Sequence, residues 1–146
     1  MNVIKVMIID EHPAVRSALQ TRLNSTSEID VVASIANIAE GEKYAQSIHP
    51  DVVLVGLRSY VDNAAAALNE IITRIAQMGI AVLILSPYPD DVEQELFYRA
   101  GAKGYLLKDI NTPQLITAIR RALSNSEVHL NVKKIYDQTT FYCPPN

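Results

Sequence analysis

Residues 50 to 59 read PDVVLVGLRS, and this stretch decides the fold class. Four consecutive apolar residues, 52 to 55, follow a proline–aspartate pair, and the run stops at Gly56. A short, continuously apolar run is typical of a strand that is buried on both faces of a parallel sheet. In such sheets the functional side chains lie just past the carboxyl ends of the strands. Gly56 stands at that place and brings no functional group.

Strand-like and helix-like segments alternate along the rest of the chain. Apolar runs at residues 3–9, 29–35, 80–86 and 103–108 predict four more strands. Helical spacing predicts helices from residue 13, over about 36–48, around 68–75 with an end near residue 79, from 90–91 to 101, and over 111–125. Five βα units with right-handed crossovers predict a doubly wound α/β sandwich, in which helices cover both faces of a five-stranded parallel sheet.

The predicted domain spans residues 1–124. Residues 125–146 have no sustained apolar period and contain two prolines near their end, so this segment is expected to be a linker or tail. The chain of 146 residues is 49% hydrophobic and 20% charged, which is typical of one globular domain. The net charge of −3 gives no general attraction to nucleic acid.

Three further features bear on location and metal binding. The apolar stretches are too short to span a bilayer, and the first residues lack a signal-peptide pattern. The single cysteine, Cys143, cannot form an internal disulfide, so a cytoplasmic location is expected. His12, His49 and His129 do not have the spacing of metal ligands.

Polar residues follow several of the predicted strands. The first strand brings Asp10 and Glu11, the fourth Ser86 and the fifth Lys108, whereas the third brings only Gly56. Because the carboxyl ends of parallel strands meet at one edge of the sheet, we expect these residues to lie close together. Adjacent carboxylates suit a hard cation such as Mg²⁺, and a hydroxyl and an ammonium suit phosphoryl oxygens. The pattern indicates phosphate chemistry.

Four motifs resemble the receiver domain of two-component response regulators. They are VMIIDEHPAVR at 6–16, PDVVLVGL at 50–57, VLILS at 82–86 and GAKGYLLKD at 101–109, and they are most similar to the DNA-binding subfamily with a LuxR- or NarL-type output domain. The resemblance covers about residues 3–124. It implies the CheY-like, flavodoxin-like (βα)5 fold with strand order 2-1-3-4-5.

The resemblance also implies roles for the residues at the strand ends. In that family the first acidic pair binds magnesium, and an aspartate at the end of the third strand accepts a phosphoryl group from a histidine kinase. A hydroxyl and a lysine coordinate the phosphate. Asp10 and Glu11 match the magnesium pair, Ser86 and Lys108 match the phosphate ligands, and Tyr105 matches the family's switch aromatic.

Gly56 departs from this pattern at the phosphoacceptor position. Glycine has no nucleophile, so an aspartyl phosphate cannot form there. The loop that follows lacks the family's usual proline, and Tyr60 occupies that region. The resemblance therefore implies an atypical, or pseudo-, receiver in which magnesium binds Asp10 and Glu11 only weakly. A Gly56→Asp substitution is expected to restore phosphorylation if the other pocket residues are in place.

Each of these residues also has a purely structural interpretation. Asp10 and Glu11 suit the start of a helix, where the dipole favours carboxylates. Lys108 is expected to form an ion pair with one of them, because the central aspartate is missing. Ser86 could cap the strand or the next helix. Tyr105 lies on a largely apolar strand and is expected to belong to the core.

The function that the resemblance implies is a non-enzymatic signalling module that works without phosphorylation. Its partners would be a second copy of itself, a sensor kinase or another regulator, and DNA through an output domain that follows the receiver. No cofactor is implied other than weakly bound Mg²⁺. Two alternatives stay open: a stand-alone adaptor, and a small-ligand or metal-binding protein of flavodoxin-like fold.

The fourth helix, fifth strand and fifth helix are predicted to form the surface for self-association. An acidic helix start and a basic helix end would be self-complementary in a two-fold dimer. The residues expected to contribute charge are Glu93, Glu95, Arg99, Lys103, Arg120 and Arg121, and those expected to contribute apolar contact are Val92, Leu96 and Phe97.

Overall fold

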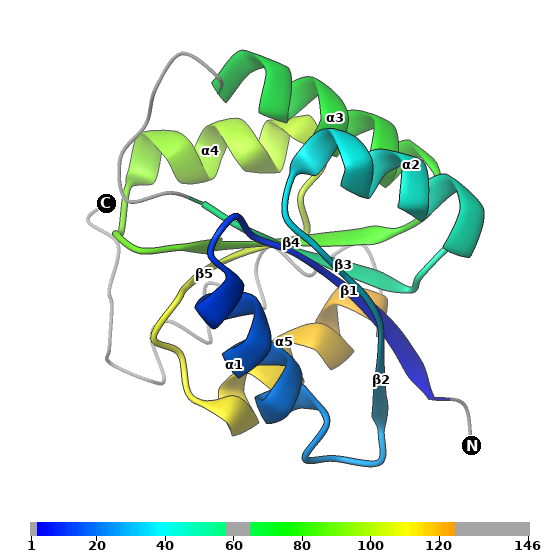
Figure 1. Ribbon diagram of the computed structural model, residues 1–146. Helices are drawn as coiled ribbons and strands as arrows, with labels where there is room; N and C mark the ends of the chain where they lie inside the picture. The colour runs from blue at the N-terminus through cyan, green and yellow to red at the C-terminus, as the bar shows by residue number, and fades with distance from the viewer. Residues whose placement is uncertain (1–2, 58–64, 125–146) are drawn as a thin grey trace.

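The computed structural model describes residues 3–57 and 65–124, in which strands and helices alternate (Figure 1). The strands are β1 (Ile4–Ile9), β2 (Ile29–Ile35), β3 (Val52–Gly56), β4 (Ala81–Ser86) and β5 (Gly104–Leu107). The helices are α1 (Pro13–Leu23), α2 (Ile38–Ile48), α3 (Ala65–Gln77), α4 (Asp91–Ala100) and α5 (Thr112–Ser124). All ten elements correspond to the segments that the sequence predicts.

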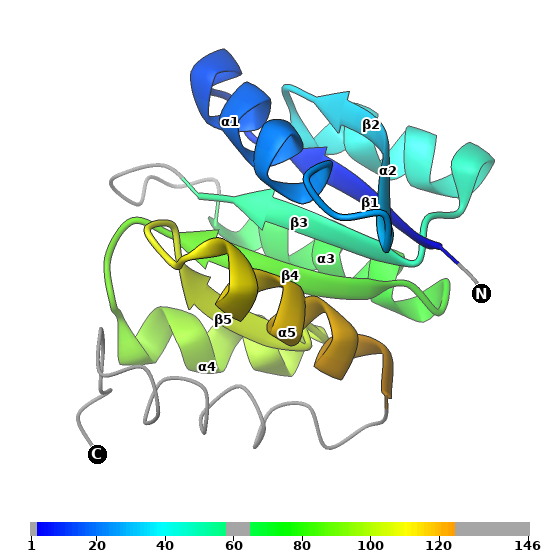
Figure 2. The same ribbon diagram turned by 90° about the horizontal axis from the view of Figure 1, so that it is seen from below.

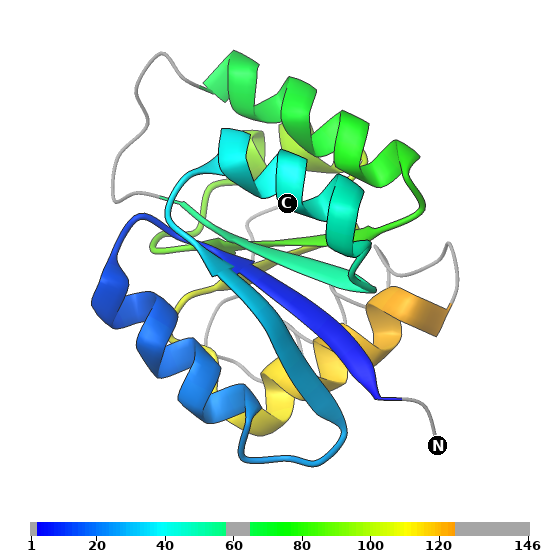
Figure 3. The ribbon, with the colours of Figure 1, turned by 45° about the vertical axis from the view of Figure 1, so that its right-hand side comes forward.

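The five strands form one parallel sheet in the order β2-β1-β3-β4-β5, which confirms the predicted doubly wound fold. Helices α1 and α5 cover one face, and α2, α3 and α4 cover the other (Figure 1). Figures 2 and 3 show the same layers from two other directions. The direction in which successive strands are added to the sheet reverses between β1 and β3. In such sheets, ligands bind at this point, outside the carboxyl ends of the strands.

The core is densest around the two central strands. Residues 52–55 of β3 and 81–86 of β4 are all buried, as expected for strands covered on both faces. The edge strand β2 is only half-buried, and its pairing with β1 has a bulge: Val6 pairs with Val31 but Met7 pairs with Ala33. A bulge makes an edge strand a poorer template for pairing with another chain.

Side-chain caps and glycine set several helix ends. The Asn37 side chain accepts a hydrogen bond from the Glu40 N–H at 2.8 Å, so α2 begins at Ile38, two residues later than predicted. Asp90 caps α4 in the same way, accepting from the Glu93 N–H at 2.9 Å. Helix α4 ends at Gly101, whose φ of 114° is accessible to glycine but strained for other residues.

Several sequence predictions fall outside the described residues. These are the linker or tail at 125–146, the loop around Tyr60, and the positions of Cys143 and His129. In residues 3–57 and 65–124, none of the helices combines the length and the apolar character that a membrane crossing requires.

Gly41 allows α2 to pack closely on β1. It is buried in the interior of α2, and a Cβ atom added there would lie 3.0 Å from Cγ1 of Ile9 and closer still to its Cδ1. Ordinary carbon contacts are longer than this, so a larger side chain at position 41 requires either a different rotamer of Ile9 or a movement of α2 away from the sheet.

We therefore expect Gly41→Ala to lower the free energy of unfolding, although alanine is favoured over glycine in helices by about 1 kcal/mol. Overpacking a core costs about 1–3 kcal/mol, which outweighs that gain. The control is the same substitution in an Ile9→Val background, which lacks Cδ1 and should tolerate it better. Urea unfolding of the four proteins measures the difference; a Gly41→Ala protein as stable as the parent would contradict this packing argument.

Candidate functional site

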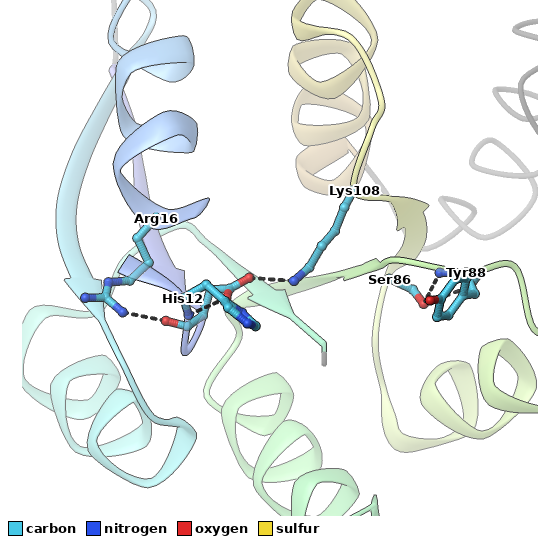
Figure 4. A network of polar contacts seen from close by, with 6 residues as sticks. His12, Arg16, Ser86, Tyr88 and Lys108 are labelled. Atoms are coloured by element: carbon cyan, nitrogen blue, oxygen red, sulfur yellow. Dashed lines mark hydrogen bonds and ion pairs between the residues drawn. The ribbon is translucent and has the colours of Figure 1, made fainter. Parts of the chain in front are cut away.

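The candidate site lies at the carboxyl ends of β1, β3, β4 and β5. These ends place Asp10, Gly56, Ser86 and Lys108 at one edge of the sheet, as the sequence predicts. The backbone joins two of them directly, because the Lys108 N–H donates to the Ser86 carbonyl at 2.8 Å. The side chains, however, divide into two separate groups (Figure 4).

The first group is an ion pair between Lys108 and Asp10. The Lys108 ammonium lies 2.9 Å from Oδ2 of Asp10, whose side chain is 1% exposed. Oδ2 has no well-aligned hydrogen bond in the described part of the chain, so this contact is best described as a charge pair. The Lys108 side chain is 20% exposed, and its ammonium is the charge that compensates the buried carboxylate. This is one of the two ion pairs that the sequence analysis proposed for Lys108.

The rest of Asp10 is held by the start of α1. Its Oδ1 accepts a hydrogen bond from the His12 N–H at 2.9 Å and lies 3.3 Å from Nδ1 of the His12 ring. The backbone carbonyl of Asp10 accepts from the Arg16 guanidinium at 2.7 Å. The Asp10 backbone and both of its carboxylate oxygens therefore have partners within the chain.

Gly56 is the residue that leaves room for this carboxylate. A Cβ atom added at Gly56 would lie 2.7 Å from Cγ of Asp10 and would overlap its Oδ2. Asp10 thus occupies the space into which a side chain at position 56 would project. A side chain at position 56 would therefore fit only if the Asp10 carboxylate moved.

Ser86 belongs to the second group and is directed away from Lys108 (Figure 4). Its hydroxyl donates to the Tyr88 carbonyl at 2.8 Å, and the Tyr88 N–H donates to it at 3.3 Å. This local turn beyond β4 satisfies a buried hydroxyl, in line with the structural alternative for Ser86. In this arrangement Ser86 and Lys108 do not face a common ligand.

Tyr105 is fully buried, as the core interpretation predicts. Its ring stacks on Phe97 with centroids 6.4 Å apart, and its hydroxyl donates to Glu93 at 2.6 Å. Burial, together with the hydrogen bond to the Glu93 carboxylate, raises the pKa of Tyr105 well above its usual value. The phenol is therefore a proton donor throughout the physiological pH range.

The geometry does not fit a divalent cation at Asp10 and Glu11. Glu11 is exposed, whereas the Asp10 carboxylate is buried and already paired with the Lys108 ammonium. No cluster of three or more His, Cys, Asp or Glu residues suited to a metal ion occurs within residues 3–57 and 65–124. A cation at Oδ2 of Asp10 would have to compete with the Lys108 ammonium.

Sequence reasoning missed the residues that complete these two groups. The sequence predicts no role for His12 beyond that of a poor metal ligand, and none for Arg16. Glu93 is predicted to contribute charge to a surface, but its carboxylate turns inward to Tyr105 and lies 3.4 Å from the Ser86 hydroxyl. The spacing of Asp90 and Glu93, three residues apart, indicates a helix start, but it does not indicate the contact with Tyr105.

The predicted self-association surface needs two corrections. Arg120 is paired with Glu28 through two contacts of 2.6 Å, which directs it toward the β2 edge and away from α4. Glu93 is turned inward, as described above, and Glu95 forms an ion pair with Arg99 on its own helix at 3.0 Å. The charges that were expected to meet in a dimer are thus largely satisfied within the chain.

The apolar part of that surface differs from expectation in one residue. Phe97 is buried in the core, but Val92 and Leu96 are 72% and 46% exposed and lie one turn apart on α4. Tyr88, in the turn before α4, is 58% exposed. Large apolar side chains clustered on a surface often mark an interaction site.

Comparisons with known proteins agree with this fold. Residues 6–120 match the family model described as the response regulator receiver domain. The nitrate/nitrite response regulator protein NarL of Escherichia coli is 29% identical over 123 residues, which are 84% of this chain and 56% of NarL. The transcriptional regulatory protein LiaR of Bacillus subtilis is 31% identical over 130 residues, 89% of this chain and 60% of LiaR.

A solved structure has the same fold. The receiver domain of the putative response regulator NarL from Mycobacterium tuberculosis superposes with a TM-score of 0.73 at 21% identity, covering 86% of this chain and 100% of that one. The chain spans a little over half the length of the curated relatives it matches.

The ion pair gives a testable expectation. Lys108→Met should lower the free energy of unfolding by about 1–3 kcal/mol, because it leaves the buried Asp10 carboxylate without its counter-charge. Asp10→Asn in the Lys108→Met background should recover part of this loss, since the asparagine is neutral and similar in size. Urea unfolding at pH 7 measures both effects. Additive losses in the double variant would show that the two side chains are not coupled.

Proposed function

Because the chain belongs to the response regulator receiver family, we propose that it is a pseudo-receiver: a non-enzymatic signalling module whose output does not depend on phosphorylation. The observation that carries the proposal is the arrangement of three residues. Gly56 supplies no nucleophile, Asp10 fills the adjoining space, and Lys108 neutralises Asp10. The centre of the pocket is occupied by the chain's own charges.

This arrangement bears on both steps of the family's chemistry. Phosphoryl transfer to an aspartate needs the nucleophile itself and a cation that offsets the charge of the phosphoryl oxygens. Here the nucleophile is absent, and the acidic residue that would hold the cation is paired with Lys108. The weak magnesium binding expected at Asp10 and Glu11 would require this pair to open first.

The proposed role is to regulate transcription in the cytoplasm through an output domain that follows the receiver. The support comes from the relatives, which are named as response regulators or transcriptional regulatory proteins and are nearly twice as long as the matched region. The net charge of −3 favours an arrangement in which a separate domain contacts DNA. Extending the reading frame beyond residue 146 and looking for a basic helix-turn-helix segment tests this part.

We further propose that the module self-associates through the α4, β5 and α5 surface, with apolar residues of α4 at the centre. Tyr88, Val92 and Leu96 support this by their exposure, and the Glu95–Arg99 pair would lie beside the contact. Apolar burial supplies affinity in such interfaces, whereas rim charges mainly supply orientation. A sensor kinase or another regulator is the alternative partner for the same surface.

The first expectation is that the protein gains no phosphoryl group when incubated with acetyl phosphate and Mg²⁺. Intact-mass spectrometry measures the gain, and a receiver domain with aspartate at the position of Gly56 serves as the positive control. A gain of one phosphoryl group that hydroxylamine removes would contradict the proposal.

The sequence alone predicts that Gly56→Asp restores phosphorylation, but the structure leads to a different expectation. The new side chain would collide with Asp10, and Ser86 is engaged with Tyr88, so the pocket residues are not in place to support phosphorylation. We therefore expect little or no phosphoryl uptake together with reduced stability. Full uptake by this variant would mean that Asp10 moves aside easily.

The second expectation concerns self-association. Leu96→Glu should abolish a dimer, because it places a charge in the apolar centre of the contact. Arg120→Glu is the matched control: it also changes an exposed side chain but lies on the β2 side, so it should leave the dimer intact. Light scattering over a range of protein concentrations measures both. Loss of the dimer in Arg120→Glu alone would place the interface elsewhere.

A further inference from the structure

A partly buried polar network joins α4 to the ends of β4 and β5. Glu93, in the first turn of α4, accepts a hydrogen bond from the Tyr105 hydroxyl of β5 at 2.6 Å. Its Oε1 also lies 3.4 Å from the hydroxyl of Ser86, the last residue of β4. The Tyr88 carbonyl, between these elements, accepts from Ser86 at 2.8 Å and lies 3.1 Å from the Tyr105 hydroxyl.

Glu93 is the strongest acceptor in this network. Tyr105 has one hydroxyl proton, and the 2.6 Å distance to a carboxylate is in the range of charge-assisted hydrogen bonds. The 3.1 Å contact with the Tyr88 carbonyl is the weaker of the two. Tyr105 is fully buried and its ring stacks on Phe97, so its hydroxyl is held in place by the packing.

We propose that Glu93 is a positioning residue that fastens α4 to the sheet and thereby fixes the exposed surface formed by Tyr88, Val92 and Leu96. In the resembling family the hydroxyl at the end of the fourth strand coordinates a phosphoryl group. In this chain the hydroxyl is engaged by the Tyr88 turn and lies beside the Glu93 carboxylate. The proposal rests on the pseudo-receiver function, because the Glu93 contacts would hold the α4 surface in place without phosphorylation.

Glu93 is fastened at both its backbone and its side chain. Its N–H donates to Oδ1 of the capping residue Asp90, and its carboxylate accepts a hydrogen bond from the Tyr105 hydroxyl. The neighbouring acid Glu95 contrasts with it, since Glu95 is exposed and forms an ion pair with Arg99 on its own helix. Val92 lies beside Glu93 in the first turn of α4, and Tyr88 lies five residues before Glu93, in the turn that leads into this helix. Loosening Glu93 should therefore loosen the surface.

Hydrogen exchange of the α4 amides, followed by mass spectrometry, tests the proposal. Tyr105→Phe and Glu93→Ala should each raise exchange in the first two turns of α4 by about tenfold, the change that a loss of about 1.4 kcal/mol produces. Glu93→Gln should have a smaller effect, because its amide oxygen still accepts a hydrogen bond. Glu95→Ala is the matched control and should leave exchange in these turns unchanged.

The pattern among the variants distinguishes positioning from general destabilisation. Exchange in α2, on the far side of α3, should stay at the parental rate, and the double variant Glu93→Ala/Tyr105→Phe should exchange no faster than the faster single variant. If Glu93→Ala does not fold, Glu93→Gln and Tyr105→Phe carry the test. Unchanged α4 exchange, additive effects, or an equal rise in α2 would overturn the proposal.

The same samples separate this proposal from the pseudo-receiver function. If the parent protein takes up a phosphoryl group, the proposed pseudo-receiver function is contradicted, and the exchange measurement still tests the role of Glu93. If α4 exchange is insensitive to Glu93 and Tyr105 while the parent stays unphosphorylated, only the positioning role fails.

Discussion

Asp10 and Lys108 form a charge pair beneath the surface of the candidate site, and the geometry around Gly56 follows from it. A carboxylate that is 1% exposed requires a nearby counter-charge, and the Lys108 ammonium at 2.9 Å provides it. The pair can form in this position only because position 56 has no side chain, since a Cβ atom there would overlap the carboxylate. The three positions at the ends of β1, β3 and β5 thus constrain one another. A substitution at any one of these positions therefore alters the space or the charge around the other two.

This constraint also determines where a signal could enter. A ligand shifts a conformational equilibrium only if it binds one state more tightly than another. Under the proposed function the pocket is not that place, because Gly56 offers no nucleophile and Asp10 is paired with Lys108. The described part of the chain offers a different place, the α4 surface with Tyr88, Val92 and Leu96 exposed. A partner that prefers one position of α4 would act through the Glu93 network in place of the pocket.

The fold could be predicted from sequence because its signals are local and agree with one another. Apolar runs mark the buried strands, and caps such as Asp90 mark helix starts. The predicted pairing of Lys108 with a first-strand carboxylate followed from counting charges. The inward turn of Glu93 could not be obtained this way, because the sequence places it among exposed acids of α4 and only the tertiary packing brings Tyr105 within 2.6 Å. The same holds for Arg120, whose partner Glu28 is 92 residues away.

A strand that delivers no functional group is nevertheless indispensable to the sheet. Strand β3 pairs with β1 on one side and β4 on the other, and residues 52–55 are buried on both faces. The stability of such a strand comes from apolar burial and from the backbone ladder, neither of which needs a side chain at the last residue, Gly56. Position 56 can therefore hold a glycine without loss of the fold. What Gly56 contributes is space, and Asp10 uses that space to meet Lys108.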